Sequence, residues 1–211
     1  MKRIVFFGDS ITDGCRNKER DDLISSLGSG FVLFAAGKLL ADNPYAYEIF
    51  NRGIGGNRSV DLYARIKKDV WELQPDVVNI LVGINDIWHE QMFCNGLDVG
   101  QYEEIYRLIV EQTKKRLPNA KLILCEPFVL RGRVTEENFA VYERIYDYAK
   151  VVKRLADEYG ETFLPLQETI ANLAQTYGDS AVLVDGIHPT AFCAEKIATE
   201  WVKCWKQIES A

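Results

Sequence analysis

Residues 77 to 82 read Val77-Val78-Asn79-Ile80-Leu81-Val82, with one polar side chain among six. A strand that faces water on one side alternates apolar and polar residues. A strand of a parallel sheet is covered on both faces, and it is apolar almost throughout. The stretch therefore predicts a central, fully buried strand.

Further apolar runs alternate with segments of helical periodicity on both sides of this stretch. The predicted strands span Arg3–Phe7, Tyr47–Asn51, Val77–Val82, Lys121–Cys125 and Thr162–Pro165. The predicted helices span Phe31–Ala41, Val60–Leu73, Gln101–Leu117, Glu136–Tyr159, Glu168–Tyr177 and Pro189–Ile208. This alternation predicts an α/β fold with a mainly parallel sheet and helices on both faces.

Length and composition predict one domain over residues 1–211, with 47% hydrophobic and 27% charged residues. The net charge is −6 with no Lys/Arg run, so we expect no nucleic-acid partner and favour a small or neutral substrate. No signal sequence is predicted, and no stretch approaches the roughly eighteen apolar residues that span a bilayer. Five cysteines without a C-x-x-C pair suggest a reduced protein. We predict a cytoplasmic protein with no membrane partner.

Polar residues follow the first three predicted strands where each strand ends. Asp9-Ser10 follows the first strand, Gly53–Asn57 the second and Asn85-Asp86 the third. Ligand sites of open parallel α/β sheets lie beyond the carboxyl ends of the strands. These three segments are therefore predicted to share one site.

A nucleophile and its base can be assigned among these residues. A serine hydroxyl needs a neighbouring proton acceptor, and the chain has only two histidines. His188 follows Asp185 by three residues on an irregular turn, where the carboxylate can fix the imidazole tautomer. Ser10 leaves the first strand through Gly8. Taken alone, these residues could equally be turn residues or helix caps.

The glycine-rich turn and the following Asn suit an acyl-transfer enzyme, which must stabilise an oxyanion with amide donors. Gly53-Ile54-Gly55-Gly56 offers backbone amides and Asn85 offers a side-chain amide. The turn does not match the G-x-G-x-x-G dinucleotide motif, and no cofactor is expected. Two separated histidines and scattered cysteines also give no metal-ligand spacing.

Gly-Asp-Ser, the glycine-rich turn, Gly-x-Asn-Asp and Asp-x-x-His-Pro occur in the order that is typical of SGNH (GDSL) hydrolases. The chain resembles this family over its whole length. The resemblance implies a flavodoxin-like, three-layer α/β/α sandwich with a five-stranded parallel sheet. It also implies a triad of Ser10, His188 and Asp185, with an oxyanion hole formed by the amides of Ser10 and Gly56 and the Asn85 side chain. Cys193 and Gly55 depart from the common family pattern.

Loops such as Ser26–Val32 and Glu126-Pro127-Phe128 resemble bacterial esterases that remove acetyl groups from xylan fragments. The expected partner is thus a small acylated substrate, an acetylated sugar, and a homo-oligomer is compatible with the sequence. Two alternatives stay open: a lysophospholipase or thioesterase for longer acyl chains, and a non-catalytic binding module. Five side chains are candidates for substrate binding: Asp9, Arg58, Trp88, His89 and Arg131.

Overall fold

The computed structural model describes residues 1–210 and contains one five-stranded sheet. The strands are β1 (Lys2–Gly8), β2 (Tyr47–Gly53), β3 (Val77–Leu81), β4 (Lys121–Cys125) and β5 (Thr162–Leu164). They lie in the order β2-β1-β3-β4-β5, and each neighbouring pair is parallel. The register sets Gly8 beside Gly53 and Leu81, so these strands end at the same level.

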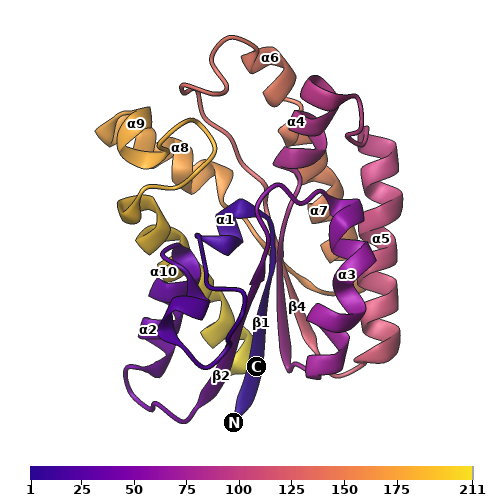
Figure 1. Cartoon of the computed structure of the whole chain (residues 1–211), viewed down its shortest axis with the longest axis vertical. Helices are drawn as coiled ribbons and strands as arrows, with labels where there is room; N and C mark the ends of the chain where they lie inside the picture. The colour runs from indigo at the N-terminus through magenta and orange to yellow at the C-terminus, as the bar shows by residue number, and fades with distance from the viewer. Residues whose placement is uncertain (211) are drawn as a thin grey trace.

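Helices cover both faces of this sheet, which confirms the predicted three-layer α/β/α sandwich (Figure 1). Helices α2 and α10 pack together on one face, while α3, α5 and α7 cover the other. The long helices are α2 (Phe31–Leu40), α3 (Ser59–Asp69), α4 (Ile84–Phe93), α5 (Val99–Arg116), α7 (Ile145–Tyr159), α8 (Gln167–Tyr177) and α10 (Ala191–Glu209). The short ones are α1 (Ser10–Asp13), α6 (Phe139–Tyr142), α9 (Asp179–Val182) and the 3₁₀ turns Ile24–Leu27 and Trp71–Leu73.

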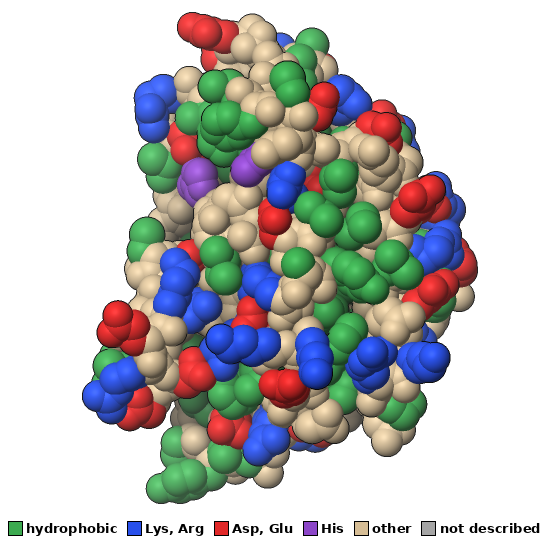
Figure 2. Space-filling view, turned by 45° about the vertical axis from the view of Figure 1, so that its right-hand side comes forward, with side chains coloured by type: hydrophobic (Ala, Val, Ile, Leu, Met, Phe, Trp, Pro, Cys, Tyr) green, Lys and Arg blue, Asp and Glu red, His purple; other side chains and the backbone are tan. Residues whose placement is uncertain are grey.

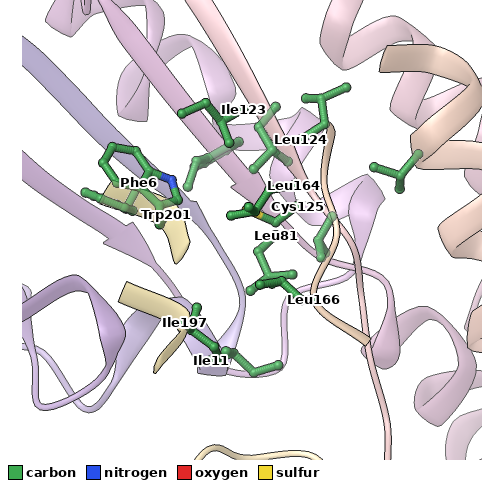
Figure 3. Close-up of a cluster of buried hydrophobic side chains, with 14 of the residues drawn as sticks. Phe6, Ile11, Leu81, Ile123, Leu124, Cys125, Leu164, Leu166, Ile197 and Trp201 are labelled. Carbon is green, nitrogen blue, oxygen red and sulfur yellow. The ribbon is translucent and has the colours of Figure 1, made fainter. Parts of the chain in front are cut away.

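The core lies between the sheet and its helices. The side chains of β3 are all buried, as the apolar run predicts. Figure 3 shows Phe6 of β1 against Trp201 of α10, and their ring centroids are 4.6 Å apart. The Trp201 indole donates to Asn79 Oδ1 at 2.8 Å, so the side-chain oxygen of the one polar residue in the central run has a buried partner. Full burial of each such large side chain stabilises the fold by about 1.5–3 kcal/mol.

Several helices differ from the predicted ones. The predicted helix Glu136–Tyr159 is two helices, because tight turns such as Arg144 N to Val141 O (3.3 Å) redirect the chain between α6 and α7. The last helix begins at Ala191, since Thr190 caps it and Pro189 pairs with Leu183 in an isolated bridge. Helix α4 was not predicted, because its first turn holds the polar pair Asn85-Asp86.

The carboxyl ends of the strands point toward the end of the sheet where α1, α4, α6, α8 and α9 gather (Figure 1). Each of the polar segments singled out from the sequence emerges there. Within residues 1–210, no helix combines the length and the apolar character needed to cross a membrane.

Candidate active site

Ser10 is the first residue of α1, directly beyond the end of β1. Asp9 caps this short helix, because its Oδ1 accepts a hydrogen bond from the Ile11 amide at 3.0 Å. A Cβ on Gly8 would lie 2.3 Å from Thr12 Oγ1 and 2.4 Å from the Leu81 carbonyl. Only glycine allows the chain to turn this tightly against β3, and the turn directs Ser10 toward the strand ends.

Ser10, His188 and Asp185 form a continuous hydrogen-bonded series. Ser10 Oγ lies 2.9 Å from His188 Nε2, and His188 Nδ1 lies 2.8 Å from Asp185 Oδ2. The other carboxylate oxygen, Oδ1, accepts from the amides of Ile187 (3.0 Å) and His188 (2.9 Å). With Nδ1 donating to the carboxylate, Nε2 is free to accept a proton from Ser10.

The surroundings of Asp185 keep its carboxylate ionised. Burial opposes ionisation, but the hydrogen bonds from His188 and from the Ile187 amide outweigh it. The pKa of Asp185 therefore lies below its ordinary value. A carboxylate that stays charged can stabilise an imidazolium formed at His188.

The turn that carries Asp185 rests on the loop after β4. The amides of Leu130 and Val134 donate to the carbonyls of Gly186 and Asp185, each at 3.0 Å. Gly132 lies so close that a Cβ there would be 2.4 Å from the Gly186 nitrogen. Backbone contacts with this loop therefore fix the position of the turn that carries Asp185 and His188.

Gly56 and Asn85 face the same cavity as the three residues of the series. This cavity of about 310 Å³ is lined by Ser10, Gly56, Asn85, Trp88, Val134, Asp185, Ile187 and His188. Asn85 Nδ2 donates to the Asn57 carbonyl at 3.1 Å, which leaves its second N–H for a ligand. The amides of Ser10 and Gly56 donate to no group of residues 1–210. These three residues, which line one cavity, can therefore offer N–H donors to a ligand.

Trp88 is the one side chain of the five substrate-binding candidates that lines this cavity among the described residues. Its ring packs edge-on against His89 and Phe93, with centroids 5.3 and 5.4 Å away. His89 is not among the residues that line the cavity, and its Nδ1 is 3.2 Å from Asn95 Oδ1. The two histidines of the chain, purple in Figure 2, lie on the same face below a group of hydrophobic side chains.

The other three candidates are engaged elsewhere. Asp9 is 1% exposed and holds the turn at Ser10, so burial separates it from a ligand. Arg58 is at the start of α3, where its Nε donates to Asp61 at 2.9 Å. Arg131 lies over the Phe139 ring and pairs with Glu136, and it lines a neighbouring pocket instead of the Ser10 cavity.

The structure gives a place to residues for which the sequence predicted no role. Val134 and Ile187 form apolar walls of the cavity. Asp86 is fully buried and accepts from the Ser59 amide (3.1 Å) and hydroxyl (2.7 Å). Its adjacency to Asn85 was the only signal available. Within residues 1–210, no three His, Cys, Asp or Glu side chains gather as a metal site would require.

An α/β sheet with this serine, histidine and carboxylate series at its carboxyl edge has the architecture of a hydrolase. The chain belongs to the GDSL-like lipase/acylhydrolase family, whose model matches residues 6–193, and it is a carboxylic ester hydrolase. An acetylxylan esterase from Geobacillus stearothermophilus is 32% identical, with 96% of each chain covered.

Two solved structures extend the comparison. A GDSL-like lipase from Parabacteroides merdae has a TM-score of 0.91 and 34% identity, covering 96% of this chain and 94% of that one. Axe2, an acetylxylan esterase from G. stearothermophilus, has a TM-score of 0.85 and 29% identity, covering 96% and 93%. These values confirm the fold and the family resemblance.

Proposed function

We propose that this hydrolase removes acetyl groups from short acetylated carbohydrates such as xylo-oligosaccharides, with Ser10 as nucleophile. The observation that carries the proposal is the 2.9 Å contact between Ser10 Oγ and His188 Nε2 inside the cavity. Solved catalytic mutants of Axe2 replace a serine, an aspartate or a histidine with alanine, which supports the same three residue types here.

In the proposed reaction, Ser10 Oγ attacks the acetyl carbonyl carbon while His188 Nε2 takes the hydroxyl proton. The carbonyl oxygen becomes an oxyanion that accepts from the amides of Ser10 and Gly56 and from Asn85 Nδ2. Collapse of this intermediate breaks the bond to the sugar oxygen, which leaves with the proton from His188. Water then attacks the acetyl-enzyme with His188 as base, releasing acetate and restoring Ser10.

The size and lining of the cavity support a short acyl group. At about 310 Å³ it is at the lower end of the range for small-molecule sites, about 300–1,000 Å³. Trp88, Val134 and Ile187 form apolar walls close to Ser10. An aromatic wall such as Trp88 also suits the apolar face of a sugar ring. The acetylxylan esterase relatives support the same class of substrate.

Substrate comparison tests this proposal. Acetate release from acetylated xylobiose is measured beside hydrolysis of p-nitrophenyl acetate, p-nitrophenyl octanoate and a lysophospholipid. We expect the acetylated sugar to react at least as fast as the aryl acetate, and the octanoyl ester hardly at all. Preference for the octanoyl ester or the lysophospholipid would overturn the carbohydrate proposal and favour the long-chain alternative.

A further inference from the structure

One arginine outside the cavity binds three parts of the proposed catalytic machinery at once. Arg65 lies on α3, and its side chain is 16% exposed. Its Nη2 donates to the Gly8 carbonyl at 3.0 Å, and its Nη1 donates to the Arg52 carbonyl at 2.8 Å. Its Nε donates to Asn57 Oδ1 at 2.7 Å. Each acceptor belongs to a different segment of the site.

These acceptors are close in sequence to the groups that would do the chemistry. Gly8 is two residues before Ser10, and Asn57 directly follows Gly56. The Asn57 carbonyl also accepts from Asn85 Nδ2 at 3.1 Å. A single guanidinium is thus connected to the nucleophile turn and, through Asn57, to both Gly56 and Asn85.

The guanidinium is itself held in one orientation. Asp69, four residues further along α3, accepts from Nη1 at 2.7 Å and balances the charge. The Phe7 ring lies beneath it, 4.5 Å from the guanidinium carbon. A planar fork with five fixed donors can bind acceptors in three directions, which the three donors of a lysine ammonium cannot reproduce.

We infer that Arg65 is a positioning residue, which sets the distance between Ser10 and the oxyanion donors at Gly56 and Asn85. The inference rests on the proposed function of these three residues. Donors to an oxyanion are effective only within about 2.7–3.1 Å of the position that the oxygen will take. A guanidinium that joins β1, β2 and the Asn57 side chain fixes this geometry before substrate arrives.

The test compares Arg65→Lys with Arg107→Lys as a matched control. Arg107 also pairs with an acid four residues away, Glu103, and also lies over an aromatic ring, that of Tyr159. It contacts no residue of the cavity. We expect Arg65→Lys to lower kcat for p-nitrophenyl acetate at least about tenfold with KM changed less than about twofold, because the transition state alone uses the oxyanion donors. Arg107→Lys should keep wild-type values.

Asn57→Ala provides a second variant, which removes one acceptor of Arg65 and leaves every charged side chain in place. It should lower kcat in the same direction by a smaller factor. Combining Arg65→Lys with Asn85→Ala should cost less than the product of the two separate losses, since both act on the same donor. If the fold-losses in kcat of the two single variants multiplied fully in the double variant, Arg65 would not act through Asn85.

The failure of this inference can be separated from failure of the proposed function. Wild-type kcat in Arg65→Lys, or a change in KM alone, overturns the positioning role. Ser10→Ala is measured in the same assay. If Ser10→Ala remained active, the proposed nucleophile would be wrong, and the assignment of Arg65 would be overturned with it.

Discussion

The part of the site that carries Ser10 and the part that carries His188 are held in place by different kinds of interaction. Around Ser10, ionisable side chains make the contacts: the half-buried Arg65 binds three acceptors, and the buried Asp86 binds the amide and hydroxyl of Ser59. Around His188, the contacts are backbone hydrogen bonds between the histidine turn and residues 130–134.

The difference follows from where each part lies in the fold. The Ser10 part joins β1, β2 and β3, whose ends are fixed by strand pairing, so side chains can connect them at set distances. The His188 turn lies between α9 and α10, outside the sheet, and a second loop supports it. Substitutions that change a charged side chain should therefore disturb the Ser10 part most. Substitutions that add a side chain against the backbone should disturb the His188 part most.

Removing one side chain from each part should give the largest effect. Ser10→Ala and His188→Ala are each expected to lower kcat by more than about 10³-fold, because nucleophile and base act as a unit. The double variant should be little worse than either one. Steady-state hydrolysis of p-nitrophenyl acetate measures all three, and a tenth of wild-type kcat in Ser10→Ala would refute the assignment.

Asp86→Asn should reveal the buried carboxyl group of the Ser10 part through the pH dependence of stability. Burial raises the pKa of Asp86 to about 7, against the opposing hydrogen bonds from Ser59. In the folded protein the Asp86 carboxyl group keeps its proton up to about pH 7, whereas in the unfolded chain it loses the proton at about pH 4. Wild-type stability should therefore fall, relative to Asp86→Asn, as the pH rises from about 4 to 7.

The size of this change is on the order of 4 kcal/mol at most, from the difference between the two pKa values. Urea unfolding of both proteins at several pH values measures this change. The difference between their free energies of unfolding cancels the contributions of groups that titrate in the same way in both proteins. A difference that stays constant from pH 4 to pH 7 would show that Asp86 does not titrate there.

Asn85→Ala should lower kcat about 10²-fold, equivalent to about 2.7 kcal/mol, with little change in KM. In the proposed reaction, the Asn85 amide meets charge that develops only in the transition state. Separate determination of kcat and KM on p-nitrophenyl acetate distinguishes this from ground-state binding. A raised KM at constant kcat would place Asn85 in substrate binding instead.

Gly132→Ala tests the His188 part and should have the smallest effect, about a tenfold loss of kcat, because a small displacement of the base is enough to slow the reaction. The added Cβ would meet the Gly186 nitrogen at 2.4 Å and the Asp185 carbonyl carbon at 2.5 Å. Gly37→Ala is the control, since a Cβ there would meet no atom within 4 Å beyond its chain neighbours and the nearby backbone of its own helix. Equal activity of the two variants would show that residues 130–134 do not position the base.

The sheet, its parallel order and the proximity of Ser10, His188 and Asp185 could be predicted because they depend on local patterns. Val77–Leu81 is apolar except for Asn79, and the polar segments directly follow strands. Asp185 and His188 are three residues apart, so one turn brings them together.

The supporting residues could not be predicted, because their partners are distant in sequence. Arg65 and Asp69 have the spacing of an ordinary ion pair on an exposed helix face, and nothing local indicates Gly8 as a partner 57 residues away. Asp86 and Ser59 meet across 27 residues. The direction of the Arg131 side chain could not be predicted either: its loop is near the site, but the side chain lies over the Phe139 ring.

The contact between Lys2 and Glu209 has a practical consequence. Their side chains pair at 2.7 Å where β1 begins and α10 ends, and Tyr47 also donates to Glu209 at 2.6 Å. Ser10 lies past the opposite end of β1, about 23 Å away for seven strand residues. In Figure 1 the start of β1 and the end of α10 are near the bottom of the molecule. Immobilising the enzyme on a solid support through Lys2 would therefore leave the cavity at Ser10 facing the solution.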